Sequence, residues 1–238
     1  MSESKKDKIK IAYLTFRILM FVSFLLNLIG IFLSKDDSQT SRLAFNAFQS
    51  ILFVLCTFIP NFLENKIKVK FPSFLVIVFL VVCVCHFILG EIQSFYVYIK
   101  GWDSILHTFT GMMLAILAYS IINSLNDNTE GLKLSPFFVA IFAICFTVTI
   151  GVLWEIVEFS LDALTGSNMQ RYMNSITLEP FSGREALKDT MKDLILDTVG
   201  AVIIATIGYF VMKKKEKAFS SLVIKKINDS EKKKGEIK

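Results

Sequence analysis

Apolar residues in this chain are gathered into blocks of about 18–25 residues, and charged residues are confined to the gaps between the blocks. As helices, blocks of this length match the hydrocarbon thickness of a bilayer. The chain is 53% hydrophobic with a mean hydropathy of +0.56, and these values support a membrane protein when taken with the block pattern. The sequence therefore predicts an all-α polytopic membrane protein, a bundle of six transmembrane helices.

The block boundaries divide the chain into a cytoplasmic N-terminal segment (1–10), a six-helix membrane domain (11–212) and a charged cytoplasmic tail (213–238). Pro72 and Pro136 stand at span starts, where a missing backbone N–H is tolerated. The first block is too long for the core of a signal peptide and is expected to remain as an anchor. The expected spans are 11–33, 43–63, 71–90, 103–123, 136–160 and 193–212.

Lysine and arginine orient the chain, because cytoplasmic segments of membrane proteins are enriched in both. An even number of spans places both termini on one side, and that side carries most of the lysines. We expect a multi-pass protein of the plasma (cell) membrane with cytoplasmic termini and with the long loop 161–192 outside. The basic ends suit an anionic lipid surface, so membrane lipids are the expected partners, and nucleic acid is excluded.

Three further expectations concern local features of the sequence. Ser182–Glu185 ("SGRE") fits a capping box, which predicts that the last helix begins near Gly183. Gly200 and Gly208 would let another helix approach closely. Arg17, near the inner boundary of the first span, is expected to extend its head group to the interface.

Carboxylates stand at the end of the fifth span, in "GVLWEIVEFSLDALTG". Helical spacing places Glu155, Glu158 and Asp162 on one face. At about 1.5 Å per residue, Glu155 lies about 28 Å from Pro136, near the outer boundary of the membrane.

Three other spans bring ionisable groups to the same boundary. His86 falls in the outer third of the third span, and both histidines of the chain lie in this layer. Ionisable residues within spans are costly and usually face the interior of the protein or a water-filled cavity. The other residues of this layer are Asp103 and His107 at the start of the fourth span, and Asp189, Asp193 and Asp197 at the start of the sixth.

The layer admits three interpretations. It could form a metal site for Zn²⁺, Mn²⁺ or Fe²⁺, since carboxylates and imidazoles on facing helices build such sites. It could form a proton or cation pathway. The acids could also have a purely structural role, in which they meet water or pair with basic residues. For Glu158, Asp162 and Asp189 this structural interpretation weighs at least as much as a functional one. The candidate metal ligands are Asp103, His107, Glu155, Glu158, Asp193, Asp197 and His86, with Glu155 and Asp193 as candidate catalytic residues.

The stretches "WDSILHTFTG", "WEIVEFSLDALTGSNMQ" and "DTMKDLILDTVGA" together resemble the YjdF-like family of predicted bacterial membrane-spanning proteins. The resemblance covers residues 86–208. It implies a membrane-spanning fold and no established activity. It also implies importance for three pairs of positions, namely Asp103 with His107, Glu155 with Glu158, and Asp189 with Asp193.

The leading functional interpretation is a metal-dependent hydrolase or transferase with an outward-facing pocket of histidine and carboxylate groups, acting on a lipid or lipid-linked substrate. A small proton- or cation-coupled transporter is the alternative, and a non-catalytic membrane partner or immunity protein is a third. No inverted repeat favours the transporter. The sequence determines neither the substrate nor the oligomeric state.

Overall fold

The apolar blocks fold as helices in the computed structural model, which describes residues 3–67, 69–128, 133–214 and 225–226. Each expected span overlaps one of these helices, so the predicted all-α polytopic class is confirmed. Residues 215–224 and 227–238, most of the expected cytoplasmic tail, lie outside the described residues. Among the residues that are described, six helices are long and apolar enough to cross a membrane: Asp7–Leu33, Gln39–Lys66, Ser73–Ile92, Trp102–Asn126, Pro136–Thr165 and Lys188–Lys214.

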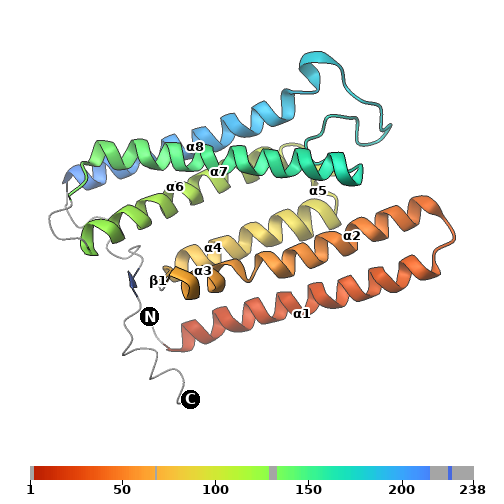
Figure 1. Cartoon of the computed structure of the whole chain (residues 1–238), viewed down its shortest axis with the longest axis horizontal. Coiled ribbons are helices and arrows are strands. Elements are labelled where there is room, and N and C mark those ends of the chain that lie inside the picture. Colours follow the sequence, from red (N-terminus) through yellow and green to blue (C-terminus); the bar gives the residue numbers. More distant parts are fainter. Residues whose placement is uncertain (1–2, 68, 129–132, 215–224, 227–238) are drawn as a thin grey trace. The chain divides into compact units, whose positions relative to one another are not determined.

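The chain divides into two compact units, the first comprising Met1–Tyr98 with Ile224–Lys238 and the second Ile99–Val223. In the first unit β1 (Val69–Lys70) and β2 (Lys225–Lys226) form a short antiparallel pair. Its helices are α1 (Glu3–Leu33), α2 (Asp37–Cys56), α3 (Ile59–Ile67), α4 (Ser73–Cys83), the π-helix η1 (Val84–Ile92) and α5 (Phe95–Tyr98) (Figure 1).

Arg17 of α1 binds the turn between α2 and α3. Its Nε donates to Thr57 Oγ1 at 2.9 Å and its Nη2 to the Thr57 carbonyl at 2.6 Å. Its guanidinium also lies over the Phe58 ring, 3.8 Å from the centroid. The helix break at this turn offers the charged head group a nearby backbone carbonyl. The apolar core of this unit consists of Tyr13, Met20, Phe53, Leu80, Cys83 and Phe87.

The second unit contains three long helices, α6 (Trp102–Asn128), α7 (Pro136–Thr165) and α8 (Lys188–Lys214), which lie side by side (Figure 1). Ser135 caps α7 by accepting a hydrogen bond from the Phe138 N–H, with Pro136 at the first helical position. Gly166 ends α7 in a left-handed conformation with φ +68°, which glycine adopts without strain.

Glycines set the contact between α6 and α8. A Cβ atom at Gly111 would overlap the backbone of Asp197, and one at Gly200 would overlap the Thr108 carbonyl. Further along both helices, a Cβ at Gly208 would overlap the Tyr119 ring. The two helices therefore run parallel in close contact, and the expected role of the two α8 glycines is confirmed.

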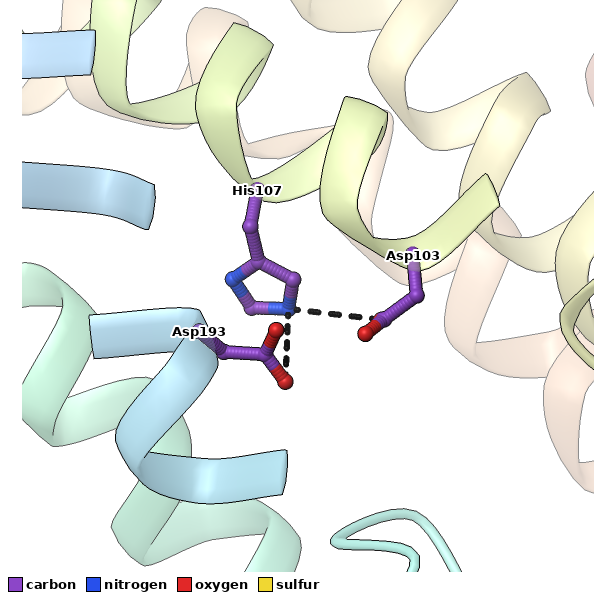
Figure 2. Close-up of side chains that lie close together, drawn as sticks. All are labelled: Asp103, His107 and Asp193. Atoms are coloured by element: carbon purple, nitrogen blue, oxygen red, sulfur yellow. Dashed lines mark ion pairs between the residues drawn. The ribbon is translucent and has the colours of Figure 1, made fainter. Parts of the chain in front are cut away.

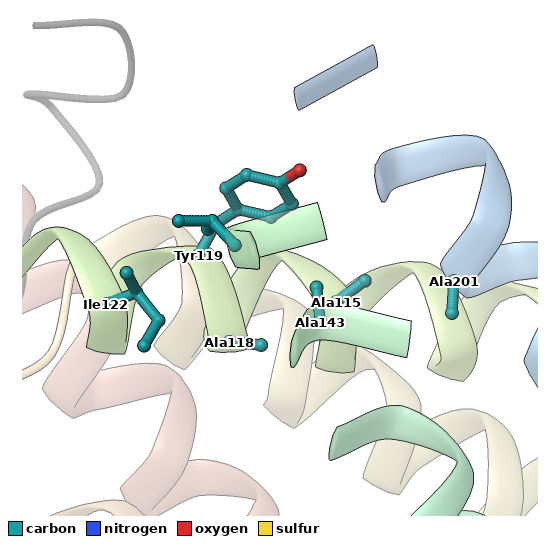
Figure 3. Packing of buried hydrophobic residues seen from close by; sticks show 7 residues of the cluster. Ala115, Ala118, Tyr119, Ile122, Ala143 and Ala201 are labelled. Atoms are coloured by element: carbon teal, nitrogen blue, oxygen red, sulfur yellow. The ribbon is translucent and has the colours of Figure 1, made fainter. Parts of the chain in front are cut away.

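The core of this unit is built mainly from small side chains (Figure 3). Alanines on all three helices allow close backbone approach, and the Tyr119 hydroxyl donates to the Ala205 carbonyl at 2.9 Å. This packing fixes the three helices relative to one another. The buried cluster consists of Ala115, Ala118, Tyr119, Ile122, Val139, Ala143 and Ala201.

The predicted capping box is wrong. Ser182 makes no capping hydrogen bond, and Gly183–Glu185 form only a short 3₁₀ turn, η2. Gly183 has a φ of +56°, which a right-handed helix cannot contain. The last helix begins instead at Lys188.

We predict that Gly200→Ala destabilises the second unit. The added methyl would meet backbone atoms of α6, which cannot move aside as a side chain can, so we expect a loss of about 1–3 kcal/mol. Thermal unfolding in detergent micelles measures the change. Gly30→Ala is the matched control, because its methyl would meet only the Leu43 side chain, at 3.1 Å. Equal unfolding temperatures for the two variants would contradict the close backbone contact.

Candidate functional site

The ionisable layer of the second unit lies where α6 begins, α7 ends and α8 begins. Because α6 and α8 run parallel and α7 runs opposite to them, these three helix ends meet. The expected convergence of acids at one depth is therefore found within this unit. Five of its carboxylate residues are less than a tenth exposed: Glu155, Glu158, Asp162, Asp193 and Asp197.

His107 lies between two aspartates, one on its own helix and one on α8 (Figure 2). Its Nε2 is 3.7 Å from Asp103 Oδ1 and 3.8 Å from Asp193 Oδ2. One ligand atom from each of the three residues falls within 4.8 Å of the others. Asp103 reaches His107 because the two residues are one turn apart on α6, whereas Asp193 depends on the close contact of α8 with α6.

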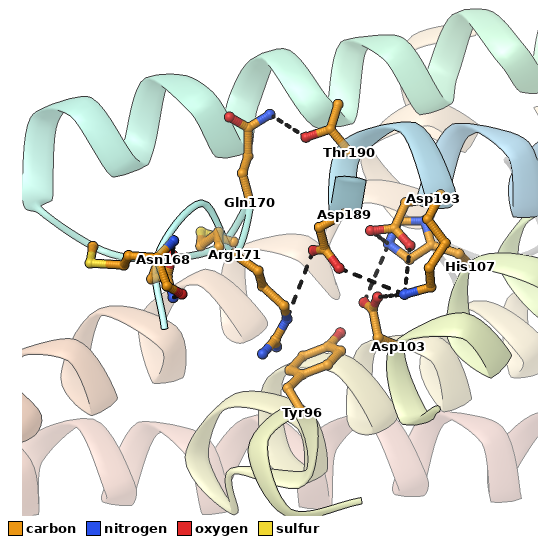
Figure 4. Close-up of polar contacts among 12 residues, drawn as sticks. Tyr96, Asp103, His107, Asn168, Gln170, Arg171, Asp189, Thr190 and Asp193 are labelled. Carbon is orange, nitrogen blue, oxygen red and sulfur yellow. Dashed lines mark hydrogen bonds and ion pairs between the residues drawn. The ribbon is translucent and has the colours of Figure 1, made fainter. Parts of the chain in front are cut away.

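Lys192 contacts the carboxylate oxygens of Asp103 and Asp193 that do not face His107. Its Nζ donates to Asp103 Oδ2 at 3.0 Å and lies 3.7 Å from Asp193 Oδ1. Each carboxylate therefore turns one oxygen to Lys192 and the other to the imidazole. The residues and contacts around this cluster are drawn in Figure 4. The spacing of Asp189 and Lys192, three residues apart on α8, could have indicated a basic residue beside the aspartates, but Lys192 was not among the residues expected at the site.

Asp197 lies on the other side of the imidazole. Its Oδ1 is 3.5 Å from His107 Nδ1, and this oxygen is buried without a hydrogen bond from the described residues. A Cβ atom at Gly151 of α7 would come within 2.7 Å of Asp197 Oδ2, so the absence of a side chain there makes room for this carboxylate. Nothing in the local sequence pattern indicated this role for Gly151.

Glu155 is tied to α8 through Gln170, a residue of the loop after α7. The Gln170 amide donates to Glu155 Oε2 at 3.2 Å. It also donates to Thr190 Oγ1 at 3.1 Å (Figure 4). The other oxygen of Glu155, Oε1, is buried and forms no hydrogen bond within the described part of the chain. Sequence reasoning missed Gln170 because a lone glutamine in a polar loop carries no signal.

Asp162 has a structural role, which the sequence left open. Its Oδ1 accepts hydrogen bonds from Ser167 Oγ at 2.6 Å and from the Met169 N–H at 2.8 Å, and its Oδ2 accepts one from the Gln170 N–H at 3.0 Å. This carboxylate folds the loop back over the end of α7. It thereby positions the Gln170 side chain for its hydrogen bond to Glu155.

Glu158 and Asp189 stand at the edges of the cluster. Glu158 is buried, and the Trp154 side chain donates a hydrogen bond to it. Asp189 Oδ2 lies 3.9 Å from Arg171 Nε, and Asp189 Oδ1 lies 3.6 Å from Lys192 Nζ. Asp189 therefore pairs with two cations, as the structural interpretation expected.

His86 belongs to the first unit. It lies in the π-helix η1, and its Nδ1 is 2.6 Å from the Tyr96 hydroxyl of the same unit. The cluster of Asp103, His107 and Asp193 lies wholly within the second unit. His86 thus has a partner of its own, Tyr96, and is not one of the three residues whose ligand atoms lie within 4.8 Å of one another.

The helices and the buried ionisable cluster define a multi-pass helical membrane protein. More particularly, the chain belongs to the family described as "Predicted membrane protein (DUF2238)", whose model matches residues 15–214. The expected membership in a family of predicted membrane-spanning proteins without a known activity is confirmed.

One relative is an uncharacterized protein of Thermotoga maritima, which is 31% identical over 127 residues. The matched part is 52% of this chain and 56% of that protein, so the chain spans little more than half of the relative's length. No solved structure matches the chain.

We predict that Asp162→Ala loosens the loop after α7. Two backbone N–H groups, one buried and one partly buried, would lose a charged acceptor, and each such hydrogen bond contributes about 1.5–3 kcal/mol. Amide hydrogen exchange around Met169 and Gln170, followed by mass spectrometry, should become at least about tenfold faster. Glu185→Ala is the control, because that carboxylate pairs with Lys188 at the exposed surface and contributes little. Unchanged exchange in Asp162→Ala would contradict the anchoring role.

Proposed function

We propose that this protein is a metal-dependent hydrolase or transferase of the plasma membrane that acts on a lipid or lipid-linked substrate. One divalent transition ion, Zn²⁺, Mn²⁺ or Fe²⁺, is bound by Asp103, His107 and Asp193. The observation that carries the proposal is the convergence of His107 Nε2 with one oxygen of each aspartate.

The spacing of these atoms suits ligands better than hydrogen-bond partners. The two Nε2–oxygen distances, 3.7 Å and 3.8 Å, exceed the 2.7–3.2 Å of ordinary N–H···O bonds. Two ligands of a tetrahedral ion with bonds of about 2.1 Å stand about 3.4 Å apart. A small inward movement of the side chains would therefore complete three bonds to one ion.

The charge balance of the cluster also supports a bound cation. Carboxylates at the three helix ends outnumber the basic side chains beside them, Lys192 and Arg171. Uncompensated carboxylates near a membrane boundary repel one another and resist desolvation. A divalent ion at His107 would supply the missing positive charge.

The remaining groups have distinct roles in this proposal. The bound ion would polarise a phosphoryl or acyl oxygen or activate a water molecule. Glu155 is the general base, because Gln170 holds its Oε2 while its Oε1 accepts no hydrogen bond from a described residue. Asp193, which the sequence offered both as a metal ligand and as a catalytic residue, acts as a ligand in this proposal. Asp162 anchors the loop after α7, and Asp189 pairs with Arg171 and Lys192.

A lipid substrate is favoured by the surface around the cluster. Large apolar side chains near the same helix ends are exposed, and at a membrane boundary they would face acyl chains. A cluster of polar side chains beside such a surface suits a substrate with an apolar tail and a reactive polar head group. These residues are Ile105 of α6, Phe159 and Leu164 of α7, and Met191 and Ile195 of α8.

A proton- or cation-coupled transporter is the second candidate. The observation that favours it is Lys192, whose Nζ lies among Asp103, Asp189 and Asp193 and already supplies one positive charge. With Asp197 one turn deeper, the acids of α8 form a row along the helix that could pass a proton or cation. In this reading protons, rather than a metal, balance the charge.

We predict that the purified protein binds one divalent ion per chain and that Asp193→Asn and His107→Gln abolish this binding. Each substitution removes one of three ligands while keeping the approximate side-chain size. Metal analysis after dialysis against Zn²⁺ or Mn²⁺ gives the stoichiometry. Glu155→Gln should retain the ion, since Glu155 is the base in this proposal.

Asp37→Asn, at an exposed position in the first turn of α2, is the control for the loss of one negative charge. Full metal occupancy in Asp193→Asn, or no metal in the unsubstituted protein, would overturn the metal proposal. The second result would favour the transporter.

We predict that the loop after α7 faces outward and that both termini are cytoplasmic, because lysine is concentrated on the side of the termini. In a variant without native cysteines, Ser182→Cys should react with a membrane-impermeant thiol reagent in intact cells. Asn65→Cys, near the end of α3, should react only after the cells are permeabilised. The reverse pattern would invert the orientation and place the cluster at the cytoplasmic face.

A further inference from the structure

We infer that Asp197 is a positioning residue, which holds a proton on His107 Nδ1 and thereby turns Nε2 toward Asp103 and Asp193. The inference deepens the proposed function and rests on it only for the ion that Nε2 would bind. It assigns Asp197 a role different from that of metal ligand, which the sequence had suggested.

The carboxylates around His107 lie on two sides of the ring. Asp103 and Asp193 face Nε2, whereas Asp197 faces Nδ1 at 3.5 Å. A neutral imidazole carries its proton on one nitrogen and a lone pair on the other. An ionised carboxylate can only accept a hydrogen bond. Lys192 lies beside Asp103 and Asp193, whereas Asp197 Oδ1 has no such cation among the described residues, so we place the proton on the nitrogen that faces Asp197. At 3.5 Å, a small movement of either side chain would complete this hydrogen bond. The lone pair then lies on Nε2.

Asp197 has no competing partner among the described residues. Lys192 turns to Asp103, Asp189 and Asp193, and no described residue donates a hydrogen bond to Asp197 Oδ1. Asp197 is 5% exposed, so bulk solvent has little access to this carboxylate. The Nδ1–H group of His107 is the nearest described donor that can compensate this buried charge.

The position of Asp197 is fixed by glycines on both neighbouring helices. Its backbone packs against Gly111 of α6, and its Oδ2 occupies the space beside Gly151 of α7. In this position the carboxylate lies on the Nδ1 side of the ring, away from Asp103 and Asp193. Carboxylates that hydrogen-bond the second nitrogen of a ligating histidine fix its tautomer and orientation in metal sites.

The chain contains only two histidines, which makes a direct test practical. Protein labelled with ¹⁵N-histidine, without metal and at one mildly alkaline pH, gives imidazole signals from His86 and His107 alone. His86→Gln assigns them. We expect a protonated Nδ1 on His107, and Asp197→Asn should shift its ¹⁵N signal or move the proton to Nε2. Asp193→Asn should leave the proton on Nδ1.

Gly151→Ala provides a second variant in case Asp197→Asn folds poorly. The new methyl would stand 2.7 Å from Asp197 Oδ2 and displace the carboxylate, so the His107 Nδ1 signal should shift in the same direction. Val152→Ala is its control, because Val152 is the next residue on α7 and is 39% exposed. An unprotonated Nδ1 in the unsubstituted protein, or unchanged His107 signals in both variants, would overturn the inference.

Metal titration separates this inference from the proposed function. We expect Asp197→Asn to weaken Zn²⁺ or Co²⁺ binding by about 10–100-fold while the Co²⁺ spectrum keeps the same coordination. Absence of binding in the unsubstituted protein overturns the metal function, and the ¹⁵N signals then still decide the role of Asp197. Unchanged affinity in Asp197→Asn, with metal bound normally by the unsubstituted protein, counts against the positioning role alone.

Discussion

The cost of burying negative charge at the end of an apolar helix bundle governs the second unit. Glu155, Asp193 and Asp197 are each less than a tenth exposed, and each has a carboxylate oxygen without a hydrogen bond from a described residue. Such groups persist only where something else compensates them. His107 is central because it is the only imidazole in the unit, and aspartates approach both of its nitrogens.

Close helix packing makes this arrangement possible. Backbone contact at Gly111 and Gly200 brings α8 near enough to α6 for Asp193 to reach His107. At Gly151, α7 leaves space for the Asp197 carboxylate. Small residues thus do two things here: they permit the helices to pack in a membrane, where no hydrophobic effect drives them together, and they set the positions of the charged groups.

The sequence predicted the helices and the layer of ionisable groups, because block length and helical spacing are local properties. It also predicted the close approach at Gly200. It could not predict that His107 faces one oxygen of Asp103 and of Asp193 while Lys192 contacts the other. That arrangement depends on the rotation of α8 against α6. The contact of Gln170 with Glu155 was equally hidden, because the Asp162 anchor that creates it joins a helix end to a loop. The start of α8 was misplaced because Gly183 adopts a positive φ.

Lys192 and a bound ion are compatible because they would contact different oxygens of Asp103 and Asp193. Lys192 Nζ lies nearest Asp103 Oδ2 and Asp193 Oδ1, and the remaining oxygens face His107 Nε2. A lysine with a 40% exposed side chain carries one charge, whereas the carboxylates that converge on these helix ends carry several. Lys192 therefore orients the two aspartates without neutralising the cluster. In the proposed site the remaining negative charge would favour a cation at Nε2, and the proton that we place on Nδ1, beside Asp197, would keep Nε2 available to receive it.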